Sequence, residues 1–289
     1  MTLEDLIYQR LTTAEPLKKK LARFGGAPAV FYQTAPSDKA QEWKGKREYP
    51  RISYVVDLQT NPERQTSGVL SLDIWGDEAG TPPEELEPDV RAALCDVFLQ
   101  PDEGPPFSLA WASTSAFEER SQAKPNTLVA GATVTFDVFA FPTQITTDPD
   151  PILAINEFVK DWAPEAVVIG KDTIESFYTA TKERPAFYFR LLNLQSSQET
   201  NTVAWMNGTI AGHIFATPEA RLQWLKALTD TLATRGEVTM LDTSPMFIQT
   251  IKADSSADRL TTGQLRLYVR FGILRRPKYA HTLMHAITT

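Results

Sequence analysis

Apolar and polar residues alternate in short segments that recur in the two halves of the chain. Residues 49–56 (YPRISYVV) alternate behind a proline, and residues 184–191 (RPAFYFRL) repeat this pattern with the proline 135 positions later. Residues 68–75 (GVLSLDIW) match residues 208–215 (GTIAGHIF), 140 positions later. Alternation with a period of two is typical of half-buried strands. Because both strands recur in the same order, the sequence predicts two copies of one folding unit.

Helical patterns recur between the strands. Residues 2–13 and 152–162 carry apolar side chains at helical spacing, and a short apolar strand follows each of them. A second helix opens with Thr-Pro at residues 81–82 and again at 217–218, where threonine serves as a cap and proline suits the first turn. The buried stripe predicted for the later helix consists of Leu222, Leu225, Leu228 and Leu232.

Each half is therefore expected to run helix, short strand, hairpin, helix, hairpin. This order predicts an α+β fold of two similar domains, each an antiparallel sheet with helices packed on one face. The proline-rich segment 146–151 (TTDPDP) favours extended backbone, so we place the domains at 1–145 and 146–289. The polar stretches predict the hairpin loops 57–67, 113–128, 192–207 and 252–262.

Composition narrows the class of protein. The 289 residues carry a net charge of −7, which argues against a general nucleic-acid coat protein but permits a pore through which DNA slides. One cysteine, Cys95, allows no disulfide within the chain and suits a reducing cytoplasm. No stretch approaches the roughly 18 apolar residues of a membrane span, and the N-terminus shows no secretory signal.

The residues that usually carry chemistry form no recognisable constellation. We expect His213 to be a partly exposed strand residue. His281 and His285 have the spacing of zinc ligands on a helix, but no HExxH glutamate lies between them and no third ligand is apparent. No glycine-rich phosphate loop and no Gly-x-Ser-x-Gly elbow occurs. The sequence therefore predicts a protein that is not an enzyme and that has no catalytic, cofactor or metal site.

Candidate interaction residues are easier to find. The closing strand of the second copy is edged by a basic cluster, for which a solvated strand edge, an acidic surface on a neighbouring subunit and nucleic acid are three possible explanations. Trp205 stands beside a turn expected at Asn207-Gly208, where either a partner chain or local packing would cover it. The candidate interface residues are Arg266, Arg270, Arg275, Arg276, Trp205, Glu84 and Glu85.

Three segments carry a family resemblance. Residues 184–195 (RPAFYFRLLNLQ) resemble the proline, aromatic-strand and Leu-Asn-x-x-Gln signature of tail terminator proteins of long-tailed bacteriophages and prophages. The hairpin, helix and closing strand with basic residues that follow are also similar. Residues 49–54 (YPRISY) and 66–75 (TSGVLSLDIW) resemble the corresponding strands of the related tail completion proteins.

The resemblance implies a virion structural protein that forms a ring, stops polymerisation of the tail tube and joins the tail to the head or neck. Expected partners are copies of the chain, the tail tube protein, sheath, and connector or neck proteins. The ring would contain six domains or six chains, and the protein would be made in the host cytoplasm. No sequence-specific binding of nucleic acid is expected, and whether DNA passes through the ring is left open. Two alternatives remain: a tail-tube or baseplate subunit of a contractile device, and a small-ligand or enzymatic module.

Overall fold

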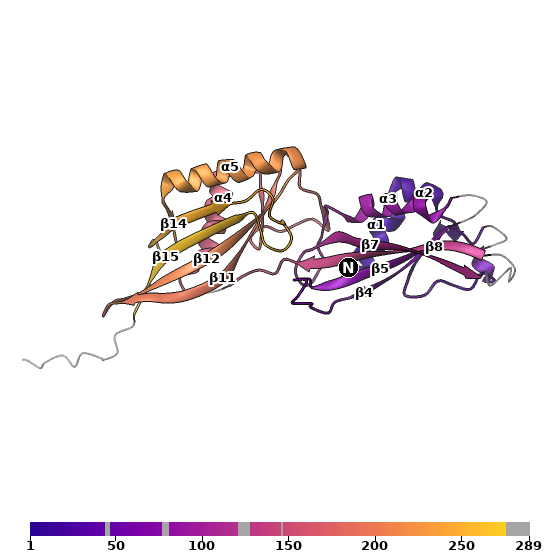
Figure 1. Cartoon of the computed structure of the whole chain (residues 1–289), viewed down its shortest axis with the longest axis horizontal. Helices are drawn as coiled ribbons and strands as arrows, with labels where there is room; N and C mark the ends of the chain where they lie inside the picture. The colour runs from indigo at the N-terminus through magenta and orange to yellow at the C-terminus, as the bar shows by residue number, and fades with distance from the viewer. Residues whose placement is uncertain (44–46, 77–80, 121–127, 146, 276–289) are drawn as a thin grey trace, which may run out of the picture. The chain divides into compact units, whose positions relative to one another are not determined.

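A computed structural model describes residues 1–43, 47–76, 81–120, 128–145 and 147–275, with side chains undescribed at Gln198 and Glu199. The chain forms two compact units. The first comprises Met1–Thr143 together with Asp172–Thr181, and the second comprises Gln144–Lys171 together with Lys182–Thr289. Each unit contains its own sheet and its own helices (Figure 1).

The first unit contains a seven-stranded sheet with the strand order β10-β6-β7-β8-β5-β4-β3. A separate two-stranded sheet pairs β1 with β2. The strands are β1 (Arg23–Phe24), β2 (Ala27–Pro28), β3 (Val30–Tyr32), β4 (Arg51–Asp57), β5 (Gly68–Trp75), β6 (Phe98–Leu99), β7 (Phe107–Arg120), β8 (Leu128–Ala140) and β10 (Phe177–Tyr178). The helices are α1 (Leu3–Thr13), α2 (Glu15–Lys20), α3 (Pro83–Leu94) and the 3-10 helix η1 (Gln41–Trp43).

The second unit contains a six-stranded sheet with the strand order β13-β14-β15-β12-β11-β9. Its strands are β9 (Val167–Ile169), β11 (Ala186–Glu199), β12 (Val203–Phe215), β13 (Glu237–Thr239), β14 (Pro245–Ala253) and β15 (Leu265–Leu274). Its helices are α4 (Pro151–Trp162) and α5 (Pro218–Arg235).

The two sheets share one strand order, β3-β4-β5-β8-β7-β6 in the first and β9-β11-β12-β15-β14-β13 in the second. Their registers agree as well. Ile52 pairs with Ile74 in the first sheet, and the residues 135 and 140 positions later, Phe187 and Ile214, pair in the second. The repeat seen in the sequence is therefore a repeat of topology and of register.

One face of each sheet lies under helices, and the core of each unit fills that layer. Helices α1, α2 and α3 cover the first sheet, and α4 and α5 cover the second (Figure 1). Alternate strand residues such as Leu72 and Phe136 in the first unit, and Phe189 and Leu267 in the second, are fully buried beneath these helices. The α+β class predicted from the alternation is confirmed.

Two details of the sheets differ from the predicted all-antiparallel arrangement. Strand β3 runs parallel to β4, and β9 runs parallel to β11. Each of these short strands reaches its neighbour through a long connection, and a parallel pair requires such a crossover. The division at residue 145 also omits a return of the chain, because residues 172–181 belong to the first unit and place β10 beside β6.

The hairpin loop predicted at 57–67 matches the structure to within one residue, the loop predicted at 252–262 lies two residues later, at 254–264, and the other two predicted loops are too long. Strand β7 continues to Arg120, and β11 continues to Glu199 with β12 resuming at Val203. Asn207-Gly208 is therefore not a turn, because both residues pair with β15 inside β12. These parts of the hairpins reach beyond the helices and are largely exposed, so their polar residues resemble a loop in the sequence.

Candidate functional site

The sheet face that turns away from the helices is the candidate functional surface of the second unit. In β15, Leu267 and Val269 are buried under the helices, so the alternate residues Arg266, Tyr268 and Arg270 point to the other side. Residues directly opposite on neighbouring strands share a face. We call this surface the second outer face; it comprises Arg190, Trp205, Asn207, Thr209, Phe247, Thr250, Lys252, Arg266, Tyr268 and Arg270.

Aromatic rings and cations are interleaved on this face. The guanidinium carbon of Arg270 lies 4.8 Å from the centre of the Trp205 ring, and the Trp205 and Phe247 ring centres are 6.4 Å apart. The Lys252 Nζ lies 5.3 Å from the centre of the Tyr268 ring. Such cation–π contacts keep long side chains extended along a surface while leaving their charge outside. Phe247 is exposed over 38% of its surface and lies beside the Trp205 ring.

Negative charge is sparse beside these cations. The sequences of β11, β12, β14 and β15 contain four Lys and Arg residues and one carboxylate, Glu199 at the end of β11. Glu237 lies on the neighbouring edge strand β13, opposite Phe247. The second outer face is thus predominantly cationic and aromatic.

One end of the second outer face is closed by the loop 254–264. The side chain of Arg190 donates to the Thr261 carbonyl oxygen, and His213 Nδ1 lies 2.7 Å from the Arg259 carbonyl oxygen. Gln264 fixes the loop to β12 by accepting from the backbone N–H of Ile214 and donating to its carbonyl oxygen, at 3.0 Å in both cases. This end is therefore part of the packed interior and not a free surface.

Burial controls the charge of the two titratable side chains under that loop. His213 is 1% exposed, and desolvation lowers its pKa to about 4, so the ring is neutral near pH 7. Desolvation also raises the pKa of the neighbouring Tyr188 to about 12. The expectation that His213 is partly exposed is wrong, because the loop 254–264 that covers it is distant in the sequence and leaves no pattern near His213.

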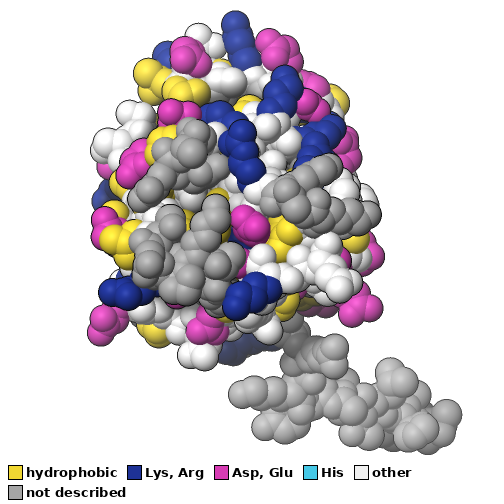
Figure 2. Space-filling view, turned by 90° about the vertical axis from the view of Figure 1, so that its right-hand side faces the viewer, with side chains coloured by type: hydrophobic (Ala, Val, Ile, Leu, Met, Phe, Trp, Pro, Cys, Tyr) yellow, Lys and Arg dark blue, Asp and Glu magenta, His cyan; other side chains and the backbone are white. Residues whose placement is uncertain are grey.

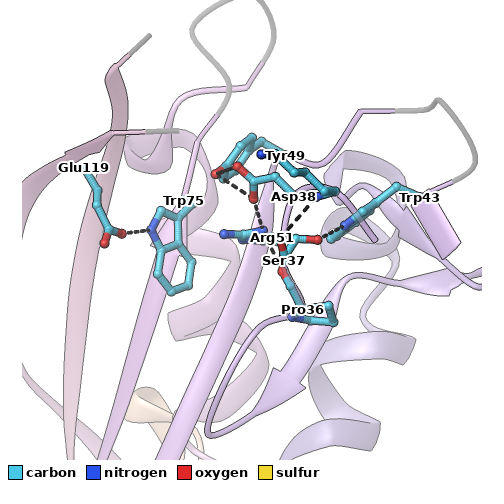
Figure 3. A network of polar contacts seen from close by, with 9 residues as sticks. Pro36, Ser37, Asp38, Trp43, Tyr49, Arg51, Trp75 and Glu119 are labelled. Carbon is cyan, nitrogen blue, oxygen red and sulfur yellow. Dashed lines mark hydrogen bonds and ion pairs between the residues drawn. The ribbon is translucent and has the colours of Figure 1, made fainter. Parts of the chain in front are cut away.

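The first unit contains a buried polar cluster at the corresponding end of its sheet (Figure 3). Arg51 Nη1 donates to Asp38 Oδ1 at 2.8 Å, with side chains only 7% and 0% exposed. The Tyr49 hydroxyl donates to Asp38 Oδ2 at 3.0 Å. The Arg51 guanidinium carbon lies 4.6 Å from the Tyr49 ring centre and 5.2 Å from that of Trp75. Burial of the Tyr49 hydroxyl raises its pKa above its ordinary value.

This cluster ties a connecting segment to the sheet. Trp75 Nε1 donates to Glu119 Oε2 at 3.2 Å, and Trp43 Nε1 donates to the Ser37 carbonyl oxygen at 3.1 Å (Figure 3). Ala186 takes the place of Arg51 in the second sheet, since both begin the strand that pairs with β5 or β12. The second unit therefore has no arginine at this position and cannot form the same ion pair. The sequence does not predict the ion pair because Asp38 lies in a polar loop.

The corresponding outer face of the first sheet has a different character. Its side chains are identified by the same alternation, since Leu70, Leu72 and Ile74 point into the core. We call this surface the first outer face; it comprises Ser53, Val55, Asp57, Val69, Ser71, Asp73, Ser113, Ser115, Thr133, Thr135 and Asp137. Small hydroxyl side chains predominate, and three carboxylates lie among them.

The carboxylates of the first outer face are only partly neutralised. Asp137 Oδ2 accepts from Arg64 at 2.7 Å, and Asp73 Oδ1 accepts from the Thr133 hydroxyl at 2.7 Å. Asp57 is exposed at the end of β4. At the loop end of this unit, by contrast, charges of both signs are interspersed (Figure 2). The first outer face therefore differs from that end in carrying an excess of negative charge.

The structure brings together some of the interface residues predicted from the sequence and separates others. Arg266, Arg270 and Trp205 lie on the second outer face, but β15 is a central strand between β12 and β14, so the basic cluster is not a strand edge. Arg275 follows β15, where its backbone N–H donates to the Thr202 carbonyl oxygen at 2.8 Å. Arg276 lies outside the described residues, as do His281 and His285.

The acidic pair Glu84 and Glu85 lies elsewhere. Both are exposed in the first turn of α3, in the helix layer of the first unit. Lys20 contacts the same helix, donating to the Glu85 carbonyl oxygen at 2.9 Å and to Asp89 at 2.7 Å. Sequence reasoning missed Phe247, Lys252 and Tyr268, although the strict alternation of residues 265–271 already placed Tyr268 between the two arginines on one face.

Within the part of the chain that the structure describes, no group of three or more His, Cys, Asp and Glu side chains is arranged to hold a metal ion. None of the described helices combines the length and apolar character needed to cross a membrane. Comparison of the chain with protein-family models, with curated proteins and with solved structures gave no match.

Proposed function

We propose that this chain is a structural subunit that forms a ring at the end of a phage-type tail tube, where it stops tube growth and joins the tail to the head or neck. The observation that carries the proposal is the pair of sheets with one strand order and one register. Two equivalent units per chain allow three chains to close a ring of six equivalent positions, and six chains to form two layers.

Several features of the surface support an assembly role. The long hairpins β7–β8 and β11–β12 extend beyond the helix layer and offer exposed polar strands to a neighbour. The second outer face carries the exposed ring of Phe247 and partly exposed tryptophan, tyrosine and arginine side chains, and such residue types are enriched where protein partners bind. The resemblance of residues 49–54, 66–75 and 184–195 to tail terminator and tail completion proteins supplies the specific location in the virion.

The deciding experiment is assembly of particles without this protein. We expect tubes of irregular, excessive length or heads and tails that fail to join, because the end of the tube is no longer capped. Electron microscopy of lysates from a deletion strain measures both outcomes, and expression of the chain from a plasmid is the control. Tails of normal, uniform length that still join heads would rule the function out.

A tail-tube subunit is the alternative that the same lysates test. A tube protein is needed for any tail to form and stacks indefinitely, so its deletion would remove tails altogether, and the purified chain would polymerise into tubes. A terminator ring instead closes after a fixed number of subunits, and the free chain can remain monomeric at low concentration until it meets the tip of a tube.

A further inference from the structure

The two outer faces of this chain are complementary in charge. By sequence, the first unit contains 14 Lys and Arg against 23 Asp and Glu, a net charge of −9. The second unit contains 15 Lys and Arg against 13 Asp and Glu, a net charge of +2. The net negative charge of the chain therefore resides in the first unit. Every copy of the chain carries one acidic unit and one weakly basic unit.

The same complementarity holds at the level of single faces. The second outer face presents Lys252, Arg266 and Arg270, and the first outer face presents Asp57, Asp73 and Asp137. Opposite charges placed across an interface guide association and fix its register. Like faces would instead bring cations against cations or carboxylates against carboxylates, which disfavours a symmetric pairing of two identical faces.

The sizes of the side chains on the two faces also differ. The serine and threonine side chains on β5, β7 and β8 are short and project little from the first outer face. Ser71, Ser113 and Thr135 lie at neighbouring positions there. The second outer face carries long side chains, with the Trp205 and Phe247 rings tilted against each other near Arg270. When two sheets pack face to face they lie about 10 Å apart, and one face of large side chains against one of small side chains fills that space.

We propose that the second outer face of one copy docks on the first outer face of the next copy, so that the chains join head to tail. The occupant of each face is thus a second copy of this chain. A contact between different faces repeats around a ring when the rotation closes, and continues as an open helix when it does not. The proposal rests on the proposed function in one respect, namely that copies of the chain assemble with each other.

The test uses two variants of the full chain with reversed charges. Variant one carries Lys252→Glu and Arg270→Glu in the second outer face. Variant two carries Asp57→Lys and Ser113→Lys in the first outer face; Lys252, Asp57 and Ser113 are exposed, and Arg270 is partly exposed. Sedimentation velocity and native mass spectrometry measure association from micromolar to about millimolar chain at low and high salt. Because surface charges are screened over about 10 Å at 0.1 M salt, association of the unaltered chain should weaken as salt rises.

Each variant alone should lose association by at least tenfold in dissociation constant, since its altered face repels the unaltered face of its copies. An equimolar mixture should regain it, because the acidic second face of variant one meets the basic first face of variant two, and the remaining two faces are unaltered. The matched control is Glu84→Lys with Glu85→Lys, which alters two exposed carboxylates of the first unit within the helix layer and should leave association unchanged. Circular dichroism and thermal melting confirm that each variant is folded.

Failure to associate at millimolar concentration and low salt would overturn the proposal, as would a mixture that stays dissociated while both variants are folded. If the sedimentation of the chain changed with salt but not with protein concentration, the charges would act within one chain and not between copies, and the proposal would also be overturned. The unaltered chain could also bind a labelled single-stranded oligonucleotide. If variant one lost this binding and mixing the variants restored no association, the second outer face would be assigned to nucleic acid instead.

If the mixture associates while tails form normally without the protein, the docking stands and the terminator function fails. If deletion disturbs tails but both variants restore them, the function stands and the docking fails.

Discussion

His213 occupies in the second sheet the position that Asp73 occupies in the first. Asp73 pairs with Ser53 across the β4–β5 ladder, and His213 pairs with Tyr188 across β11–β12. The two side chains differ in burial, since Asp73 lies partly exposed on the first outer face and His213 is covered by the loop 254–264. One position of the repeated unit therefore contributes to a surface in one copy and to the interior in the other.

The burial of His213 predicts a pH dependence of stability. Its pKa is about 4 in the folded chain against about 6.5 when unfolded, so the unfolded state binds the proton first as pH falls. The stabilisation present above pH 6.5 is therefore lost between pH 6.5 and pH 4, by about 3 kcal/mol of unfolding free energy. Denaturant unfolding at pH 7 and pH 4.5 measures the loss, to which carboxylates also contribute.

The variant His213→Gln isolates the histidine in that experiment. It keeps a hydrogen-bonding side chain opposite the Arg259 carbonyl oxygen but does not titrate, so its stability should change less between the two pH values. Arg190, Arg266 and Asp258 are the charged groups that act on His213, and they are present in both proteins. An identical pH dependence in the variant and the parent chain would contradict the assignment.

The buried core of the second unit predicts the cost of two truncations. Phe189→Ala and Leu228→Ala each remove a side chain that is at most 1% exposed, which should lower the unfolding free energy by about 2–5 kcal/mol. Leu222→Ala is the matched control on α5, because Leu222 is 60% exposed and should change stability by less than about 0.5 kcal/mol. The midpoints of urea unfolding compare the three variants, and equal midpoints for Leu228→Ala and Leu222→Ala would refute this.

The ion pair between Arg51 and Asp38 predicts an asymmetric response to substitution. Asp38→Ala leaves a buried guanidinium without its carboxylate and should destabilise the first unit by about 3–5 kcal/mol. The double variant Asp38→Ala with Arg51→Met removes both charges and should recover part of that loss. Chemical denaturation of both variants measures the difference.

The exposed pair Arg64–Asp137 provides the comparison for that experiment. Arg64 is half exposed, and Arg64→Ala should cost no more than about 1 kcal/mol because solvent screens the pair. If Arg64→Ala destabilised the first unit as strongly as Asp38→Ala, burial would not explain the strength of the Arg51–Asp38 contact.

The helix caps of the second unit predict another contrast. Asp150 Oδ1 accepts from the backbone N–H groups of Ile152 and Leu153, at 2.7 and 3.2 Å, at the start of α4. Asp150→Ala should therefore cost about 1 kcal/mol, with about 2 kcal/mol as an upper value. Thr217 precedes α5 without a side-chain hydrogen bond to the helix, so Thr217→Ala should have a smaller effect. Thermal melting of the two variants compares their losses of stability. A larger loss for Thr217→Ala than for Asp150→Ala would contradict the assignment of Asp150 as the stronger cap.

Sequence reasoning succeeded where the information was local. Alternation in residues 52–56 and 187–191 identifies paired strands because one face of each sheet is buried, and the repeat of their spacing predicts equal register in the two units. The Thr-Pro opening also predicts helix α3, which begins at Pro83, but the N-cap is Pro82 and not Thr81, and no side chain caps the helix.

The remaining features depend on residues that are distant in sequence. The sequence predicts Leu222 in the buried stripe of α5, but that stripe consists of Ala220, Leu225, Leu228 and Leu232. The phase of a helix on its sheet is set by tertiary packing. The contact of Asp38 with Arg51 and the cover that the loop 254–264 places over His213 arise in the same way. The second outer face could have been recognised in β15 alone, but its partners on β14 required knowledge of the strand order.

The return of residues 172–181 to the first unit has a consequence for how the chain is made. Strand β10 pairs with β6, and the Tyr178 ring stacks near Phe98, with centres 6.3 Å apart. During synthesis from the N-terminus, the first sheet can gain this edge strand only after α4 and β9 of the second unit have left the ribosome. Until then the unpaired backbone of β6 remains a template for other strands. A fragment cut at residue 145 would keep that open edge permanently and should aggregate more readily than the full chain.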